Sequence, residues 1–166
     1  ARLEGEGFEA PRLDYADPAS IEACVTEVLG ATGGTLGALF NNGAWAMPGA
    51  IEDLPVEGLR EIFEANFFGW HVLTRRLIPT FRAQGAGRII QCSSVLGFMP
   101  YTWRGAYVST KFALEGLSDV LRLELRGSGI HVVLIEPGPI TSKIRQNAVA
   151  HFEQWIDTES SARKAE

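Results

Sequence analysis

Three side chains in this sequence have the types and spacing needed to move a proton: Ser94, Tyr107 and Lys111. Tyr107 and Lys111 are four positions apart in Tyr-Val-Ser-Thr-Lys, and positions i and i+4 of a helix share one face. A free phenol is a poor acid or base at neutral pH, because its pKa is about 10. A neighbouring ammonium favours the phenolate, so we expect Lys111 to lower the pKa of Tyr107 toward the range useful for general acid–base catalysis.

The same residues also have a simpler structural interpretation. Tyr-x-x-x-Lys spacing occurs by chance in many helices, usually as a surface pair worth about 0.2–0.5 kcal/mol. Ser94 could bond only to the backbone that follows its strand. Motifs elsewhere in the chain are therefore needed to distinguish a catalytic role of these three residues from a structural one.

Strand-like and helix-like segments alternate along the chain and would position these side chains. Short apolar runs predict strands, and apolar residues at helical period predict helices. Asp17 followed by Pro18 predicts the start of a helix, and Gly30 predicts its end. The predicted strands cover residues 8–13, which Pro11 interrupts, 36–41, 87–93 and 130–135; the predicted helices cover 17–30, 57–84 with a break near Phe68-Gly69, and 107–126.

Strands separated by helices imply right-handed crossovers and a parallel sheet. The expected fold is a Rossmann-like, doubly wound α/β sheet, with residues 1–166 in a single domain. The segment 87–93 has the continuous apolar character of a strand buried on both faces. Ligands of such sheets bind beyond the carboxyl ends of the strands, and Asn42, Ser94 and Pro137-Gly138 each follow a predicted strand directly.

Composition excludes several classes of function. The 166 residues carry a net charge of −5, which argues against nucleic acid as a partner, because phosphate binding needs a basic surface. The longest apolar runs are too short to span a bilayer, and no basic and apolar leader opens the chain. Cys24 and Cys92 form no disulfide framework, and no Cys/His set has metal-ligand spacing. We therefore expect no metal, and a reducing cytoplasmic environment.

Five motifs in order along the chain resemble those of the short-chain dehydrogenase/reductase family. Asn41-Asn42-Gly43-Ala44 resembles the family's turn after its fourth strand, and Asn66 matches its helix asparagine. Ser94, Tyr107 and Lys111 match its active-site serine, tyrosine and lysine. The remaining two matches are Pro137-Gly138-Pro139-Ile140-Thr141, which resembles the loop over the nicotinamide, and Asp14, which resembles an aspartate near the adenine. The sequence segments Arg104–Tyr107 and Leu121–Leu125 resemble those of the family branch that contains retinol, hydroxysteroid and aldehyde reductases.

The resemblance implies a role for each catalytic residue in hydride transfer between a nicotinamide cofactor and an alcohol or carbonyl. Tyr107 would be the proton donor or acceptor, and Lys111 would lower its pKa and bind the nicotinamide ribose. Ser94 would hold and polarise the substrate oxygen, because a hydroxyl can both donate and accept. Asn66 would anchor a water that links Lys111 to solvent.

The resemblance also implies an NAD or NADP site, without indicating which of the two. Thr141 and the main chain of Ile140 would hold the carboxamide, and Asn42 and Gly43 would pass under the adenosine ribose. The full set of expected cofactor-binding residues is Asp14, Asn42, Gly43, Ala44, Tyr107, Lys111, Pro137, Gly138, Ile140 and Thr141. By the same resemblance we expect a homodimer or homotetramer that pairs the helices carrying Asn66 and Tyr107.

Apolar residues surround the expected reaction centre and indicate the class of substrate. They lie after the Asn42-Gly43 turn, before Tyr107, and beyond the nicotinamide loop: Trp45, Met47, Leu96, Phe98, Met99, Tyr101, Trp103, Phe152 and Trp155. An apolar lining favours an aliphatic, aromatic, steroid- or retinoid-like alcohol or carbonyl. Several of these residues could instead belong to the core.

The chain departs from the family pattern at its beginning. Family members open with a strand, a glycine-rich turn and a helix whose N-terminus binds the pyrophosphate. Gly5-Glu6-Gly7 does not fit that pattern, and residues 1–7 look like the end of a helix before the strand at 8–13. We therefore expect a partial domain that lacks its first two strands, in a fragment of a longer enzyme. Two alternatives stay open: a catalytically silent domain acting as an interaction or assembly module, and the related epimerase/dehydratase class.

Overall fold

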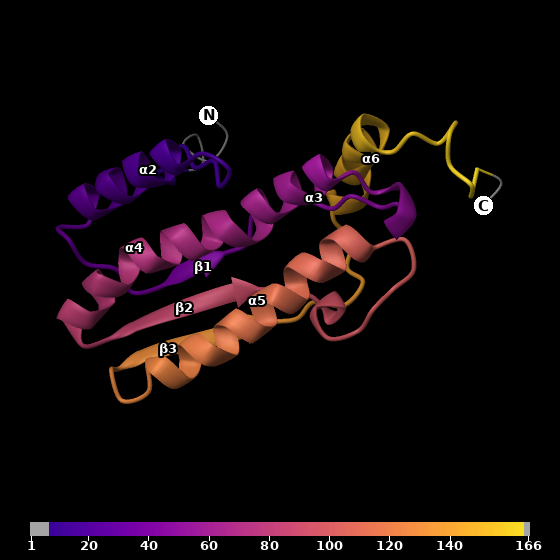
Figure 1. Cartoon of the computed structure of the whole chain (residues 1–166). Coiled ribbons are helices and arrows are strands. Elements are labelled where there is room, and N and C mark those ends of the chain that lie inside the picture. The colour runs from indigo at the N-terminus through magenta and orange to yellow at the C-terminus, as the bar shows by residue number, and fades with distance from the viewer. Residues whose placement is uncertain (1–6, 165–166) are drawn as a thin grey trace.

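The fold is a three-stranded parallel sheet with helices packed against it, as a computed structural model of residues 7–164 shows (Figure 1). The strands are β1 (Leu39–Asn41), β2 (Gly87–Cys92) and β3 (Ile130–Ile135), in the order β1-β2-β3. The α-helices are α2 (Pro18–Ala31), α3 (Val56–Phe63), α4 (Gly69–Gln84), α5 (Gly105–Glu124) and α6 (Ile144–Trp155). Shorter helical turns are η1 (Ile51–Asp53), η2 (Glu64–Phe68) and η3 (Val95–Gly97). The expected Rossmann-like α/β fold with a parallel sheet is confirmed.

The crossover helices cover one face of this sheet. β1 leads through α3 and α4 to β2, and β2 leads through α5 to β3, so two right-handed crossovers run in the same direction. α4 contacts β1 and β2, α5 contacts β3, and α2 packs on α4. The strands alternate accordingly: Ile89 and Gln91 are buried under the helices, whereas Arg88 is exposed. The prediction that residues 87–93 are buried on both faces is therefore wrong for the described part of the chain.

Helix boundaries follow the local signals in the sequence. The Asp17 carboxylate accepts a hydrogen bond from the Ala19 N–H at 2.9 Å, which caps α2, and Pro18 begins the helix. Gly85, in the left-handed conformation at φ 66°, ends α4. The predicted helix 17–30 and strand 130–135 are confirmed to within one residue.

Two strand predictions need correction. Residues 8–13 form no strand: Pro11 removes a backbone donor, and no other strand pairs with this segment in residues 7–164. β1 begins at Leu39 rather than at Leu36, because the Gln84 side chain takes both the N–H and the carbonyl of Leu36, each at 2.8 Å. The expected helical ending over residues 1–7 falls mostly on residues 1–6, which lie outside the described part of the chain.

The predicted break in the long helix is a π-helical turn. η2 joins α3 to α4 without interrupting the helix, and it carries one widened turn across Glu64–Phe68. Such turns are rare and often occur at functional sites, because they insert one residue and change the direction of a side chain. Here the turn carries Asn66, whose side chain is completely buried.

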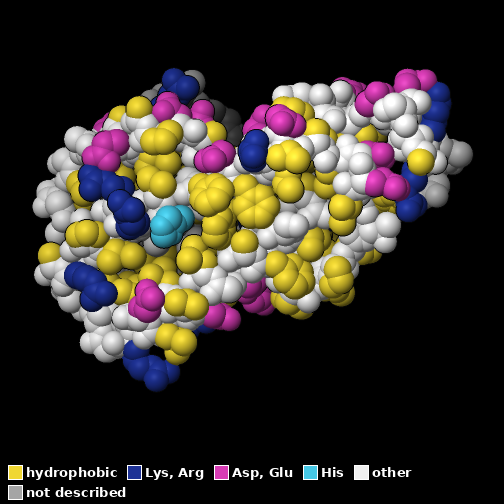
Figure 2. Space-filling view, viewed as in Figure 1, with side chains coloured by type: hydrophobic (Ala, Val, Ile, Leu, Met, Phe, Trp, Pro, Cys, Tyr) yellow, Lys and Arg dark blue, Asp and Glu magenta, His cyan; other side chains and the backbone are white. Residues whose placement is uncertain are grey.

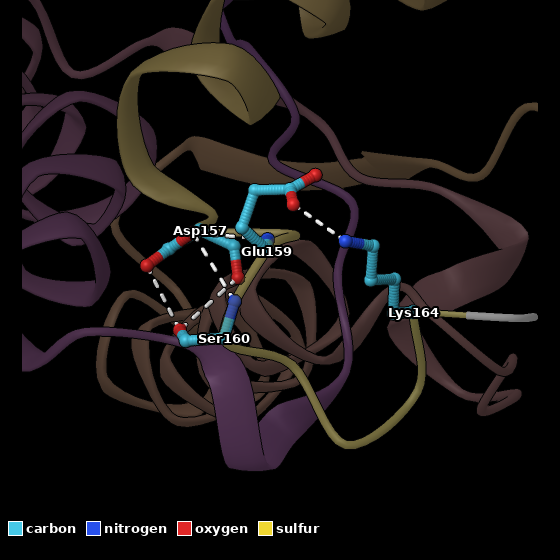
Figure 3. Close-up of polar contacts among 4 residues, drawn as sticks. All are labelled: Asp157, Glu159, Ser160 and Lys164. Carbon is cyan, nitrogen blue, oxygen red and sulfur yellow. Dashed lines mark hydrogen bonds and ion pairs between the residues drawn. The ribbon is translucent and has the colours of Figure 1, made fainter.

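Beyond α6 the chain continues in polar turns. The Asp157 carboxylate accepts hydrogen bonds from the backbone of Glu159 and Ser160 and from the Ser160 hydroxyl, and Glu159 pairs with Lys164 (Figure 3). The bonds from Ser160 and Glu159 lower the pKa of Asp157. None of the helices between residues 7 and 164 combines the length and apolar character needed to cross a bilayer.

The connection into β3 generates a first prediction. Gly129 has φ 78°, and a Cβ there would lie 2.0 Å from the Gly85 carbonyl oxygen, so Gly129→Ala combines backbone strain with a clash. We expect it to lower the free energy of unfolding by about 2 kcal/mol or more in urea titrations. Gly116→Ala is the matched control, since nothing lies within 4 Å of its Cβ position in the middle of α5. It should raise stability by about 0.5–1 kcal/mol; equal effects of the two changes would contradict the prediction.

Candidate active site

Tyr107 and Lys111 lie on one buried face at the start of α5. Their exposed fractions are 8% and 1%, and the Lys111 Nζ lies 5.4 Å from the centroid of the Tyr107 ring. The expected shared face is therefore confirmed, and the pair is not a surface pair. α5 fits close to η1 because it begins at Gly105, where a Cβ would lie 2.7 Å from the Ile51 side chain.

The Lys111 ammonium is enclosed by the end of β2 and by α4. Its Nζ donates to the Cys92 carbonyl oxygen at 2.8 Å and lies 4.4 Å from the centroid of the Trp70 ring. Burial lowers the pKa of Lys111 to about 8, and the Cys92 thiol and the Glu115 carboxylate act in the opposite direction. Lys111 therefore remains mostly charged at neutral pH, although it is almost fully removed from water.

The expected acidification of Tyr107 is not seen. Burial is the largest influence and raises the pKa of Tyr107, whereas a hydrogen bond with the Ser94 side chain lowers it by less. The phenol is therefore protonated at neutral pH, because removal of the hydroxyl from water outweighs any favourable charge nearby. A protonated phenol is the form that can donate a proton.

Ser94 has the structural role weighed from the sequence, and its hydroxyl also lies near Tyr107. Its Oγ accepts a hydrogen bond from the Leu96 N–H at 3.1 Å and caps η3, and its side chain is close enough to Tyr107 to lower the pKa of the phenol. The serine follows β2 directly, so the carboxyl end of that strand brings it to the first turn of α5. A structural bond thus fixes the hydroxyl beside the phenol.

Asn66 connects the π-helical turn to two other parts of the site. Its Oδ1 accepts from the Trp45 N–H at 3.1 Å, and its Nδ2 donates to the Trp45 carbonyl at 2.8 Å. The same Nδ2 lies 3.5 Å from the Thr110 Oγ1 on α5. Asn66 therefore holds the loop after β1 in place next to the helix that carries Tyr107 and Lys111.

The loop after β3 lies beside the loop after β2 and is open on its outer side. The Val95 N–H donates to the Pro137 carbonyl at 3.1 Å, which joins the two loops. Gly138, Ile140 and Thr141 are exposed, and nothing lies within 4 Å of a Cβ built on Gly138. An exposed apolar side chain such as Ile140, with 69% of its surface accessible, and free space above Gly138 fit a ligand that packs on this loop.

The turn after β1 is covered on one side by Tyr15. A Cβ on Gly43 would lie 2.7 Å from the Tyr15 ring. Burial raises the pKa of Tyr15, and the nearby backbone of Asn42 and Gly43 lowers it by less. Ala44, which follows, is half-buried. Asp14 has the turn chemistry considered as its alternative role: its Oδ1 accepts from the Ala16 N–H at 3.0 Å.

Only some of the expected apolar lining gathers at Tyr107. Met47, Ile62 and Ala106 are buried with Tyr107, and Trp45, Leu96 and Trp155 pack around them. α6 reaches this cluster through a stacked Trp45–His151 pair with ring centroids 3.7 Å apart. Phe98, Met99 and Tyr101 are exposed instead, and Trp103 and Phe152 line a separate cavity near Gly49.

Several buried polar residues near the site were not anticipated. The Asn41 Nδ2 donates to the Thr74 Oγ1 at 3.0 Å and to the Gln91 Oε1 at 2.9 Å, which ties β1, α4 and β2 together. The presence of Gln91 in an otherwise apolar strand was the sequence feature that could have indicated this buried polar cluster. The contact of Trp70 with Lys111 had no such signal, because Trp70 fits the apolar period of its helix.

The burial of Lys111 generates a second prediction. Its pKa falls from about 10.5 in the unfolded chain to about 8, so the unfolded state binds more protons between these pH values. Stability must rise with pH across that window, and below it the buried charge costs on the order of 3 kcal/mol. Lys111→Met should therefore raise the free energy of unfolding at pH 7 by about 1–3 kcal/mol in denaturant titrations.

The pH dependence distinguishes this effect from a gain in packing. The difference between Lys111→Met and the unchanged protein should shrink toward zero as the pH approaches about 10.5, where the lysine is neutral in both states. Lys143→Met, at an exposed position, is the control and should show no such trend. A gain in stability that is independent of pH would disprove the assigned cause.

The chain is similar to known proteins over most of its length. A family described as short chain dehydrogenase matches residues 1–152. The uncharacterized oxidoreductase YbbO of Escherichia coli K12 is 42% identical over 146 residues, which cover 88% of this chain and 54% of YbbO. An NADPH-dependent 3-dehydrocapnine reductase of Ornithobacterium rhinotracheale is 36% identical over 159 residues, covering 92% of this chain and 56% of that protein.

A solved structure shares the arrangement of the elements. The 3-ketoacyl-(acyl-carrier-protein) reductase of Brucella melitensis, complexed with NADH, is similar with a TM-score of 0.78 and 27% identity, over 82% of this chain and 59% of that one. The chain thus spans about half the length of the curated relatives that it matches. The family match over most of the sequence and the shared fold lead to one conclusion: the chain belongs to the short-chain dehydrogenase/reductase family.

Proposed function

We propose that this chain is part of a nicotinamide-dependent oxidoreductase that reduces an apolar aldehyde or ketone, or oxidises the corresponding alcohol, with Tyr107 as the general acid or base. The observation that carries the proposal is the buried Tyr107 phenol, which lies near Ser94 and on the same helix face as a buried lysine. A tyrosine, a serine and a lysine assembled at the carboxyl ends of parallel strands occupy the usual ligand position of this sheet architecture.

The described residues fit the nicotinamide half of a dinucleotide. The exposed loop of Gly138, Ile140 and Thr141 has room for a planar group, and Lys111 uses one of its three N–H donors on Cys92. When bound, the cofactor would supply or accept the hydride. On the adenosine side, Asp14, Asn42, Gly43 and Ala44 stay our predicted contacts, although Tyr15 covers Gly43 in this structure. The choice between NAD and NADP stays open.

The residues of this chain would handle the proton and the substrate oxygen. Ser94 would donate to a carbonyl oxygen or accept from an alcohol, because its hydroxyl can rotate while its oxygen still caps η3. The protonated Tyr107 would then give its proton to the developing alkoxide in the direction of reduction. Lys111 would stabilise the resulting phenolate, and Asn66 would hold a water that returns a proton to the pair.

The apolar cluster around Tyr107 supports an apolar substrate. Met47, Leu96 and Trp155 offer no charged group to a ligand, and burial of apolar area would provide most of the binding energy. The relative from Ornithobacterium rhinotracheale is named as a reductase that uses NADPH, which agrees with reduction of a carbonyl. A cytoplasmic location, suggested by the free Cys24 and Cys92, stays a prediction.

A direct test uses the natural gene product and its Tyr107→Phe variant. We expect NADPH or NADH consumption with a panel of apolar aldehydes and ketones, and a loss of kcat by about 10²–10⁴-fold when the hydroxyl is removed. Tyr101→Phe is the matched control, because Tyr101 is 64% exposed and should leave the rate unchanged within about twofold. Retention of full activity by Tyr107→Phe would refute the assignment. Failure of the unchanged protein to bind either dinucleotide would favour a catalytically silent domain.

We also propose that the protein assembles through the face carrying α4 and α5. Apolar side chains gather across the middle of this view of the molecule (Figure 2). Phe68 on η2 and Phe112, Val120 and Leu123 on α5 are 44–63% exposed. Apolar surface of this kind favours burial against a second copy.

The assembly proposal predicts a change of oligomeric state. Phe112→Glu places a charge in the apolar face and should convert a dimer or tetramer into a smaller species in sedimentation experiments, because burying an unpaired carboxylate is unfavourable. Val149→Glu is the control at an apolar residue that is 52% exposed on α6, outside α4 and α5. Identical sedimentation of Phe112→Glu and the unchanged protein would argue against this interface.

A further inference from the structure

Lys111 is an unusual group because it is charged and almost completely buried. Only 1% of its surface is accessible, and one of its donors is used by the Cys92 carbonyl at 2.8 Å. A buried ammonium loses its hydration, so neighbouring groups must compensate if it is to remain a cation. Two of its neighbours, Trp70 and Glu115, have so far had no part in the proposed reaction.

Trp70 provides an aromatic face under the ammonium. Its ring centroid lies 4.4 Å from the Lys111 Nζ, and an indole is the side chain that attracts a cation most strongly. The ring cannot turn away easily, because its Nε1 donates to the Gly43 carbonyl at 2.9 Å and the side chain is fully buried. The preceding Gly69 permits close packing of α4 here, since a Cβ on it would lie 2.1 Å from the Tyr15 carbonyl oxygen.

Glu115 provides a negative charge one helical turn beyond Lys111. The two residues have i, i+4 spacing on α5, so their side chains share a face. The Glu115 Oε1 and the Ser93 Oγ are both buried with no hydrogen-bond partner in the structure. A Cβ on Gly97 would lie 2.7 and 2.6 Å from these two oxygens, so the absence of a side chain at Gly97 leaves room for them.

We propose that Trp70 and Glu115 are positioning residues that hold the Lys111 ammonium as a cation at the carboxyl end of β2, facing Tyr107. The inference rests on the proposed function for its catalytic meaning, but the holding of the charge can be measured without cofactor or substrate. The groups that face Lys111 are the Glu115 carboxylate and the Tyr107 phenol on α5, the Cys92 thiol and carbonyl on β2, and the uncharged Trp70 ring on α4. Glu115 is the carboxylate in this set.

The decisive experiment is a titration of the Lys111 ammonium by NMR in the natural gene product labelled with isotopic lysine. The Lys111 signal is assigned by its loss in Lys111→Arg. We expect Glu115→Gln, which keeps the shape of the side chain, to lower the titration midpoint by about 0.5 pH unit or more, because the charged form loses a favourable neighbour. Glu124→Gln, at an exposed position later on α5, is the matched control and should leave the midpoint unchanged.

Trp70→Phe tests the aromatic face separately. Phenylalanine keeps a ring but attracts a cation less strongly than tryptophan, so the midpoint should again move downward. Trp103→Phe is the control for replacing a tryptophan elsewhere, and its circular dichroism and unfolding curve provide the comparison for folding. If Trp70→Phe does not fold, the Lys111 titration midpoint of Glu115→Gln alone tests the proposal. An unmoved Lys111 midpoint in Glu115→Gln overturns the proposal.

The pH dependence of the enzymatic reaction provides a second, independent test. If the proposed function holds, Glu115→Gln should shift the alkaline limb of the kcat/KM profile downward by the same amount as the NMR midpoint. The control Glu124→Gln should keep the original profile. A shifted NMR midpoint in a protein without oxidoreductase activity would support the positioning role and reject the function, whereas an active protein with an unmoved midpoint would do the reverse.

Discussion

The desolvation of one lysine is the constraint on which the arrangement of this site depends. An ammonium with 1% of its surface exposed is unfavourable in any protein interior unless dipoles, aromatic faces and opposite charge surround it. The Cys92 carbonyl, the Trp70 ring and the Glu115 carboxylate come from a strand and two helices that are far apart in sequence. Their meeting point fixes where β2 ends, how closely α4 approaches, and which face of α5 turns inward.

The parallel sheet makes this meeting possible with few residues. Each right-handed crossover returns the chain to the same edge of the sheet, so the residues after β1, β2 and β3 become neighbours. Hydrogen bonds then fix the loops relative to one another: Asn66 holds the segment after β1, and Pro137 accepts from the segment after β2. The site is thus joined by hydrogen bonds between loops where protons would be exchanged, and it is exposed along the loop of Gly138–Thr141, where a ligand would lie.

Much of this could be predicted from residue types and spacing. The i, i+4 relation placed Tyr107 and Lys111 on one face, and the alternation of strands and helices indicated the parallel sheet. The prediction of a strand at residues 8–13 was wrong. A strand forms only where a neighbouring strand pairs with its backbone, and this pairing is not encoded in the local sequence. The prediction that β2 is buried on both faces failed for a similar reason, because the burial of a strand depends on which helices cover it.

The pKa of Tyr107 shows a different limit of sequence reasoning. Spacing indicates that a cation is near, but it cannot indicate how much water both groups lose, and here burial is the larger influence. Trp70 was hidden for a related reason: an apolar residue at helical period looks the same whether it fills the core or lies under a charge. Glu115 appeared to be an ordinary helix residue until the small space at Gly97 was known.

The widened turn at Glu64–Phe68 has a consequence for how this segment can tolerate change in length. An α-helix advances about 100° per residue, whereas the five residues of η2 form one wide turn that takes up an extra residue. Removal of one residue from η2 would therefore restore a regular helix and keep α3 and α4 nearly in phase, so that Ile62 and Trp70, both fully buried, would still face inward. Removal of one residue from the regular part of α3 or α4 would instead rotate the two buried faces relative to each other by about 100°. Length differences among homologous sequences should therefore fall in η2 rather than within the two flanking helices.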